Sequence, residues 1–509
     1  MVFTLVLDGQ SLTIAVLVEA ARSEARISLH PDSLARIRRN REFAERVADR
    51  GDVVYGLSTG VGVRKKNRVA NDLVRFNQRI IRETSTGQGP AIPADVTRAT
   101  AIMLLNTMAG GRTMVRPELA LRLEDRLSHG PPLRAIPTLG TTGIGDVVPL
   151  SHLASDLLGD HFLPAAGEAL PLIAQSSLAT ASGALALHDT RRLIVELTQL
   201  AALDIEGFAA NPSPYHWMAG VVRPYPGYMR ALDAIGRALD GSALHTTEPR
   251  HLQAPLSFRC AAAVLGAADD ALSFCEGQAG IEINAHQQNP LALHEEDTML
   301  PVAHFDMQPL ATALDVARLA LAPCLTCQAE RSCKLLQARE SGLTDGLEPR
   351  SDGGGHGYSG LAFTLQAITA EAKLLIQPVS AEVGSASQAE GIEDRITMAG
   401  LAARKLAEMT TLGFRIAAIS TLIASQAIHL RGGSHRLGPV LRDTLLRIRS
   451  IVPALSAGCP PPLDLEPLYS ALRGGMLSGS GQGAGAAAVP GAAGPTPAGA
   501  APTAAHSRL

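Results

Sequence analysis

The chain has 509 residues, of which 46% are hydrophobic, 18% are charged and only 3% are aromatic, and its formal net charge is -3 at pH 7. This composition excludes intrinsic disorder of the whole chain, and the charge gives no support for a nucleic-acid surface or a polybasic membrane anchor. Because charged residues make up about 25% of an average soluble protein, we expect much of the surface to be buried between subunits of an oligomer.

The start of the chain does not read as a signal peptide, because residues 1–18 lack a basic region and carry Asp8 and Gln10 within the apolar stretch. Six cysteines in 509 residues are sparse and favour free thiols in a cytoplasmic protein. Cys324 and Cys327 have the spacing of metal ligands, but no second pair completes a zinc set. We therefore expect no metal site.

Helical periodicity dominates the sequence. Apolar residues return every three or four positions in the stretches 14–25, 33–48, 96–108, 310–321 and 396–430. Ala and Leu fill these stretches and alternating strand patterns are few, so we predict a mainly α fold of closely packed long helices. The apolar stretch 414–430 keeps Arg415 and several small polar residues, which is more typical of a buried helix than of a membrane span.

A first glycine-rich loop, Tyr55-Gly-Leu-Ser-Thr-Gly-Val-Gly62, follows an apolar pair of valines. Its glycines, Gly60 among them, allow positive φ and let the backbone approach a ligand closely. The loop has neither the lysine of a P-loop nor the spacing of a dinucleotide fingerprint. Tyr55 could act as a general base if its pKa were lowered, or could simply pack under the turn.

A second glycine-rich loop, residues 137–146, leads into a predicted helix with Asp146 as its N-cap and Pro149 in its first turn. The free N–H groups and the positive dipole end at such a helix start suit an anion, a carboxylate or a developing oxyanion. A purely structural helix start explains the pattern as well.

The two loops resemble motifs of the histidine and aromatic amino-acid ammonia-lyases. The first is similar to their Tyr-Gly-Val-Asn-Thr-Gly-Phe-Gly, and residues 145–152 are similar to their Gly-Asp-Leu-Ala-Pro-Leu-Ala-His. Further similar segments lie, in the family's order, at 7–9, 116–118, 257–260, 282 with 284, 289–291, 329–331, 359–360 with 366, and 393–394. The preserved order from residue 5 to about 435 makes a chance resemblance implausible.

The resemblance implies an ammonia-lyase-like fold with a central bundle of long helices, a homotetramer, and active sites assembled from more than one subunit. It also implies an electrophile, methylidene-imidazolone, which forms when an Ala-Ser-Gly triplet cyclises and loses water. The family uses the loop tyrosine as base and an arginine for the substrate carboxylate, which places these roles on Tyr55 and Arg259.

Three regions are predicted along the chain. Residues 1–200 form an N-terminal lyase-like domain that carries both loops, and residues 201–477 form the long-helix bundle and a helical C-terminal part. Residues 478–509 consist mostly of Gly, Ala, Pro, Ser and Thr. Such a tail cannot bury enough apolar surface to offset its ordering entropy, so we predict that it is disordered.

The sequence departs from the family at the electrophile. Counting back from Asp146, the triplet position reads Gly143-Ile144-Gly145, which has no serine to dehydrate. We therefore expect no cofactor. Thr141-Thr142-Gly143 is a displaced alternative, whose central threonine could give an ethylidene analogue of the electrophile.

Several positions around the electrophile differ from the family as well. The family's Asn in Leu-Asn-Gly-Thr-Gln becomes Ala174, the tyrosine before Ser-Leu-Arg becomes Leu256, a Ser-His pair becomes Glu83-Thr84, and Asn-Phe-His becomes His304-Phe-Asp306. The candidate catalytic residues are Tyr55, Arg259, Glu393, His304 and Asp306. The candidate pocket residues are Gly60, Thr84, Ala174, Leu256 and Asn289. His304 could equally be a core histidine.

One general base typically contributes about 10²–10⁴-fold to a rate, which is too little to remove the weakly acidic β-proton of an amino acid. The sequence therefore favours a cofactor-free elimination, isomerisation or cyclisation of a small or carrier-bound substrate that is already activated, as an unsaturated or thioester-type acid, in specialised metabolism. Two alternatives stay open. One is an inactive pseudoenzyme that binds a ligand or partners an active paralogue, and the other is an ammonia-lyase with a rearranged Thr-Thr-Gly cofactor.

Overall fold

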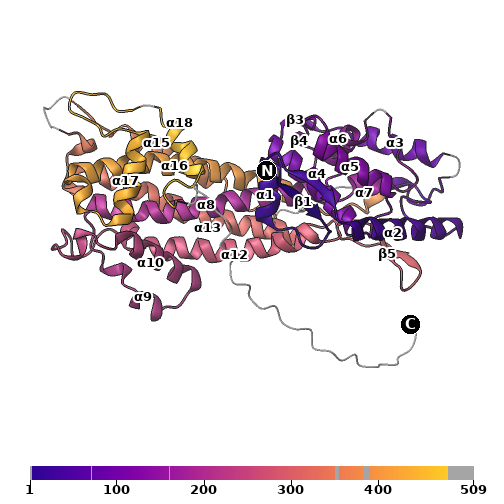
Figure 1. Ribbon diagram of the computed structural model, residues 1–509, viewed down its shortest axis with the longest axis horizontal. Coiled ribbons are helices and arrows are strands. Elements are labelled where there is room, and N and C mark those ends of the chain that lie inside the picture. Colours follow the sequence, from indigo (N-terminus) through magenta and orange to yellow (C-terminus); the bar gives the residue numbers. More distant parts are fainter. Residues whose placement is uncertain are drawn as a thin grey trace.

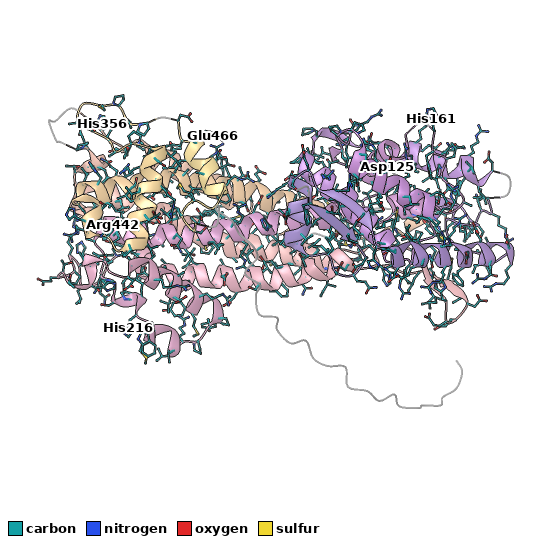
Figure 2. All side chains as sticks on the ribbon, viewed as in Figure 1. Asp125, His161, His216, His356, Arg442 and Glu466 are labelled. Atoms are coloured by element: carbon teal, nitrogen blue, oxygen red, sulfur yellow. The ribbon has the colours of Figure 1, made fainter. Side chains whose placement is uncertain are left out.

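A computed structural model of the chain describes residues 3–69, 72–159, 161–349, 355–381, 389–462 and 464–479. The tail predicted at 478–509 therefore lies, from residue 480 onward, outside the described residues. The molecule is elongated, with the N-terminal part at one end and the C-terminal helices at the other (Figure 1). Figure 2 shows the side chains in the same view, with Asp125 and His161 on the N-terminal part and Arg442 and Glu466 on the opposite part.

Four long helices run side by side along the long axis and form the centre of the molecule (Figure 1). They are α8 (Ser177–Phe208), α12 (Ala261–Asn284), α13 (Gln308–Leu335) and α16 (Ala399–Leu430). Alanine and leucine side chains fill the space between them, and the small alanines allow the helices to approach closely. The prediction of a mainly α fold with a central bundle of long helices is confirmed.

The N-terminal part packs six helices and three pairs of short strands beside the start of α8. The helices are α1 (Ile14–Arg22), α2 (Pro31–Asp49), α3 (Leu73–Thr84), α4 (Ala94–Ala109), α5 (Pro117–His129) and α6 (Val147–Leu158), followed by the short α7 (Ala169–Ile173). The strands are β1 (Thr4–Leu7) parallel to β2 (Arg26–Leu29), β3 (Gln88–Ala91) antiparallel to β4 (Pro137–Leu139), and β5 (Leu291–Leu293) antiparallel to β6 (Thr298–Leu300). The pair β5–β6 joins this part from far along the sequence, after α12.

Shorter helices cover the far end of the bundle (Figure 1). They are α9 (Met218–Val221), α10 (Pro226–Leu239), α11 (Leu256–Arg259), α14 (Ala338–Ser341), α15 (Leu361–Leu374), α17 (Pro439–Ile451) and α18 (Glu466–Arg473). Single 3₁₀ turns are η1 (Gly62–Arg64), η2 (Ser213–Tyr215), η3 (Ala243–His245), η4 (Asp345–Leu347), η5 (Ala389–Gly391) and η6 (Gly433–Arg436). All five periodic stretches predicted from the sequence correspond to helices, although α1 ends at Arg22 instead of residue 25 and α16 begins at Ala399 instead of residue 396.

Three helical segments of the described chain are long and apolar enough to cross a membrane by length and composition alone: Ala169–Phe208, Gln308–Leu335 and Ala399–Leu430. Their apolar windows are 89%, 61% and 83% buried inside the fold. The stretch 414–430 is a largely buried part of α16, as predicted. The apolar character of these helices is therefore used to pack them against one another.

A buried ion pair fixes the short α11 against the bundle. Arg331 on α13 is only 1% exposed, and its Nε donates to Oδ2 of Asp204 on α8 at 2.8 Å. Gln328 donates to the same oxygen at 2.9 Å. Arg331 Nη1 donates to the carbonyl oxygen of Ser257 in α11 at 2.9 Å. Burial raises the pKa of Asp204 to about 6, although Arg331 and Gln328 oppose the rise.

Arg331→Met should destabilise the protein by about 3–5 kcal/mol, because it leaves the Asp204 carboxylate buried without its cation. Thermal unfolding at pH 7.5 measures the loss. The double variant Arg331→Met/Asp204→Asn should recover a large part of it, since it removes the unpaired charge. Arg38→Met, at an exposed arginine, is the matched control. A single variant no less stable than this control would contradict the assignment.

Candidate active site

The tyrosine loop lies between α2 and α3 on the N-terminal part. Val54 and Leu57 anchor it in a small apolar cluster that also contains Ala292 from β5. Gly56 and Gly62 have φ of +71° and +57°, a region that side chains other than glycine rarely adopt. The closed loop brings the Gly62 N–H to the hydroxyl of Tyr55, which accepts it at 3.0 Å.

The surroundings of Tyr55 hold its hydroxyl in the neutral form. Burial raises the pKa of Tyr55, and the negative charge of Glu393 adds to the rise. The hydrogen bond from Gly62 and the positive charge of Lys65 act in the opposite direction but are outweighed. A base needs a lowered pKa, and among the described residues the charge of Lys65 is too weak to give Tyr55 one.

Glu393 influences Tyr55 through its negative charge, and it belongs to a segment that contacts the tyrosine loop. Glu390, in η5, accepts a hydrogen bond from Lys65 Nζ at 2.9 Å and ties the two segments together. Glu393 itself is exposed, three residues further along the chain. The structure therefore brings Tyr55 and Glu393, two of the predicted catalytic residues, into one electrostatic environment.

The triplet loop, residues 141–146, is held by two segments from later in the chain. The carbonyl of Gly143 accepts the Thr397 hydroxyl at 2.7 Å, and the carbonyl of Thr142 accepts the N–H groups of Thr397 and Met398 at 3.1 and 2.9 Å. These contacts come from the start of α16. On the other side, Ile144 forms an antiparallel bridge with the residue at 306, just before α13.

The residues of this loop do not fit the family's electrophile. Ile144 has no hydroxyl to lose as water. In the displaced triplet, the amide nitrogen of Gly143 would have to attack the carbonyl carbon of Thr141. That N–H instead donates to the Thr141 hydroxyl at 3.0 Å, two residues back. The loop thus keeps a tight backbone turn and offers no dehydratable serine.

Asp146 stands at the N-cap position of α6, as predicted, but its side chain does not cap that helix. Its Oδ2 accepts the N–H of Ala179 in the first turn of α8 at 2.8 Å, and its Oδ1 accepts the Thr141 hydroxyl at 2.6 Å. Burial raises the pKa of Asp146 to about 6 against these hydrogen bonds. Asp146 therefore lies at the positive N-terminal end of α8, where its partner Ala179 is 33 residues further along the chain.

Asp306 is engaged with groups other than His304. It accepts hydrogen bonds from Arg395 Nε at 2.5 Å and from the N–H of Gln308 at 2.9 Å, the latter in the first turn of α13. Burial alone would raise the pKa of Asp306, but these two partners hold it below its usual value. Asp306 is a fixed carboxylate, and no contact between Asp306 and His304 is found among the described residues.

His304 is exposed and contacts a histidine that the sequence analysis did not single out. Its ring meets that of His286 edge to face, with centroids 5.9 Å apart and planes at 89°. Burial, together with the electrostatic influence of His304 and Arg112, lowers the pKa of His286 to about 4. Its buried Nε2 has no hydrogen-bond partner in the described part of the chain. His286 lies between the matched residues 282 with 284 and the matched segment 289–291, and this position was the signal that could have found it.

The histidine pair lies beside the triplet loop. The carbonyl of Phe305, next to His304, accepts the N–H of Gly145 at 3.3 Å and the hydroxyl of Ser176 at 3.1 Å. A neutral imidazole with a free nitrogen can accept or donate one proton. The backbone of Phe305 thus connects this histidine pair to the triplet loop.

The predicted pocket residues lie in different places. Ala174 ends α7 next to the triplet loop, since a Cβ on Gly145 would lie 3.7 Å from its carbonyl carbon. Asn289 accepts the N–H of Val302 at 2.9 Å beside the strand pair β5–β6. Gly60 lies in the tyrosine loop, where a Cβ would meet Arg64 at 2.7 Å.

A cavity of about 530 Å³ separates η1 from α3, and Thr84 lines it. Thr84 closes one end through a 2.7 Å hydrogen bond between its hydroxyl and that of Ser151 on α6. Val61, directly before Gly62, lines the cavity from the loop side. The next residue after Val61, Gly62, donates to the Tyr55 hydroxyl and connects the cavity wall to the candidate base along the chain.

Arg259 and Leu256 lie at the other end of the bundle. Phe258 of α11 stacks on Phe208 at the C-terminus of α8, with ring centroids 4.3 Å apart. The triplet loop, in contrast, contacts the first turn of α8. Because α8 has 32 residues, its two ends are about 48 Å apart. One chain therefore does not bring Arg259 to Tyr55.

Comparison with known proteins places these features in context. The model of the aromatic amino acid lyase family matches residues 12–163 and 161–450. A histidine ammonia-lyase of Gloeobacter violaceus is 32% identical over 500 residues, covering 93% of this chain and 96% of that protein. A tyrosine aminomutase of Streptomyces globisporus is similar in structure, with a TM-score of 0.87 and 26% identity over 94% of this chain and 98% of that one. An ergothioneine-degrading ergothionase of Treponema denticola has the same fold, with a TM-score of 0.86 and 24% identity over 93% and 99%.

The depressed pKa of His286 predicts a pH dependence of stability. Between pH 6.5 and 4 the imidazole of His286 is protonated in the unfolded chain but stays neutral in the folded protein. The free energy of unfolding should therefore fall as the pH is lowered through this range. The expected loss is about 3 kcal/mol. His286→Gln should flatten this part of the curve, as measured by thermal midpoints at several pH values. His161→Gln, at an exposed histidine, should leave the wild-type slope, and equal slopes in all three proteins would contradict the assignment.

Proposed function

The chain belongs to the aromatic amino acid lyase family, and we propose that it is an enzyme that works on an already activated substrate without the family's electrophile. The triplet loop is the observation that carries this proposal. It keeps its hydrogen bonds to Thr397, Met398 and Phe305, while Ile144 takes the place of a dehydratable residue. We propose elimination, isomerisation or cyclisation as the reaction class.

Activation of the substrate follows from the missing group. In the family, the electrophile makes the β-proton removable and the amine a good leaving group. A chain without it needs a substrate in which a thioester or unsaturated system acidifies the proton, or in which the leaving group is already good. The names of the similar proteins include an ergothioneine-degrading enzyme, so this fold serves substrates beyond the common amino acids.

We further propose that the complete site forms between copies of the chain in a homotetramer. The charge of Lys65 does not offset the rise in the pKa of Tyr55, and Arg259 lies near the opposite end of α8, a helix about 48 Å long. Large apolar side chains that a single chain leaves exposed, Phe274 and Ile281 on α12 and Leu319 on α13, offer surface for such an assembly. Arg259 of a second copy would lower the pKa of Tyr55 and pair with the substrate carboxylate.

We propose the following roles for these residues. The Tyr55 phenolate removes the proton next to the activating group, and the electron pair of that C–H bond forms the new double bond. Arg259 holds the carboxylate in place. His304 and His286 lie on the triplet-loop side, where a histidine can return a proton to the leaving group or the product. We propose a cytoplasmic setting and a small or carrier-bound substrate.

The raised pKa of Tyr55 also favours one alternative. A pseudoenzyme that binds a ligand in the same pocket needs no base, and a neutral Tyr55 hydroxyl that accepts the Gly62 N–H suits that role. An ammonia-lyase with a Thr-Thr-Gly cofactor remains the second alternative. The two experiments below separate all three.

The intact mass of the purified protein should equal the mass of its sequence. Cyclisation of a triplet would remove two water molecules, one in ring closure and one in dehydration. Peptide mapping by mass spectrometry covers residues 137–146 directly. A deficit of two waters in the peptide that holds 141–143 would overturn the cofactor-free proposal and establish the rearranged cofactor.

Tyr55→Phe and Arg259→Met should each lose at least 100-fold in activity, yet a mixed oligomer of the two should regain part of it. In such a mixture some sites receive Tyr55 from one copy and Arg259 from another. Activity is followed by deuterium incorporation from D₂O and by absorbance of the unsaturated product, with free amino acids, their thioesters and their N-trimethylated forms as substrates.

Tyr225→Phe, at an exposed tyrosine, is the matched control and should keep full activity. Wild-type rates in Tyr55→Phe would remove this tyrosine from the mechanism. Exchange or turnover absent from the wild-type protein with every substrate class would favour the pseudoenzyme.

A further inference from the structure

The cavity between η1 and α3 is lined by three guanidinium groups. One face of α3 turns toward it, because residues 72, 75, 76, 79, 80, 83 and 84 recur at helical spacing. Arg75 and Arg79 come from this face, and Arg64 comes from η1. Apolar side chains, among them Phe76 and Ile80, complete the wall. A volume of about 530 Å³ suits a small-molecule group.

Two of these cations lack a partner. Arg79 donates to Glu83 at 2.6 Å. Asp72 is occupied as the N-cap of α3, where its Oδ1 accepts the backbone N–H of Arg75 at 2.9 Å. In the described residues, no ion pair or side-chain hydrogen bond engages the guanidinium of Arg64 or Arg75. Arg64 and Arg75 therefore line the cavity without an ion-pair partner among the described residues, although Asp72 and Glu83 line it as well.

The sequence around the cavity concentrates positive charge. Between residues 64 and 82 the chain carries Arg64, Lys65, Lys66, Arg68, Arg75, Arg79 and Arg82, and only one acidic residue, Asp72. The whole chain, in contrast, has a net charge of -3. Three arginines and two acidic residues, Asp72 and Glu83, line the cavity, and Glu83 is paired with Arg79. The resulting excess of positive charge attracts an anion.

The position of the cavity links it to the candidate base. Val61 lines it, and the next residue, Gly62, donates to the Tyr55 hydroxyl. A molecule whose reacting carbon lies at Tyr55 can therefore extend another part of itself between η1 and α3. The carboxylate next to the reacting centre is assigned above to Arg259, so the cavity would bind a different anionic group.

We propose that this cavity binds a phosphate group carried by the substrate, and that Arg64 and Arg75 hold it. A phosphate monoester carries a charge of about -1.5 to -2 at neutral pH, which matches two unpaired guanidinium groups better than one carboxylate does. Arginine also pairs with phosphate oxygens through two parallel N–H bonds. The inference rests on the proposed function only in assigning this phosphate to the same molecule that reaches Tyr55.

The phosphate could belong to a small phosphorylated acid or to a coenzyme A-type thioester. Isothermal titration of the full chain with inorganic pyrophosphate, coenzyme A and malonate distinguishes these sources. We expect pyrophosphate or coenzyme A to bind at least tenfold more tightly than malonate, a dianion without phosphorus. Tighter binding of coenzyme A than of pyrophosphate would identify the carrier-linked class, and the reverse order would identify the small phosphorylated acid.

The double variant Arg64→Gln/Arg75→Gln should weaken phosphate binding at least tenfold. Arg38→Gln/Arg39→Gln removes the same charge from a second arginine-lined hollow on α2 and should leave binding unchanged. Equal affinity in the wild type and both variants would overturn the proposal, as would malonate binding as tightly as phosphate. A change of oligomeric state in the first variant alone would also overturn it, because the face would then be an interface between copies.

Binding is measured without turnover, so it is independent of the proposed function. Tyr55→Phe should lose turnover and still bind pyrophosphate as tightly as the wild type. If the wild type turns over a substrate but binds no phosphate, only the proposed phosphate site is contradicted. If the wild type binds phosphate but turns over no substrate class, only the proposed reaction is contradicted.

Discussion

The buried carboxylate of Asp146 joins the triplet loop to the first turn of α8, because one oxygen accepts the Thr141 hydroxyl and the other the N–H of Ala179. Its own N–H donates to the carbonyl of Gln175 at 2.6 Å. Burial opposes the charge and raises the pKa to about 6, so the carboxylate stays ionised at neutral pH only through these partners and the positive end of α8. The triplet loop, the start of α6 and the start of the bundle are thereby fixed relative to one another.

A second constraint is the length of α8. Its N-terminus contacts the triplet loop and its C-terminus contacts α11, so the two groups that would bind and deprotonate a substrate lie at opposite ends of one rigid helix. The buried Arg331–Asp204 pair holds α11 there. This separation within one chain is the reason why we propose that another copy supplies Arg259. Burial and the charge of Glu393 raise the pKa of Tyr55 in the single chain.

The triplet loop is held mainly through its backbone. The hydrogen bonds from Thr397, Met398 and to Phe305 do not depend on which side chain stands at position 144. This backbone arrangement is therefore compatible with an isoleucine at that position. This chain has two further groups of reactive or charged side chains near these loops. One is the neutral His286 beside His304, and the other is the pair of unpaired arginines that line the η1–α3 cavity.

The sequence by itself determined the features that depend on neighbouring residues. Helical periodicity located α2, α4 and α16, and Gly56 and Gly62 of the tyrosine loop have positive φ, because both features follow from local backbone preferences. Gly60 does not have a positive φ. Only the tertiary structure decided the partners of each charge. Asp146 caps α8 instead of α6, Asp306 pairs with Arg395 89 residues away instead of serving His304, and Arg259 lies far from Tyr55. These pairings join residues far apart in the chain, and no local pattern records which of them the packing of the long helices brings together.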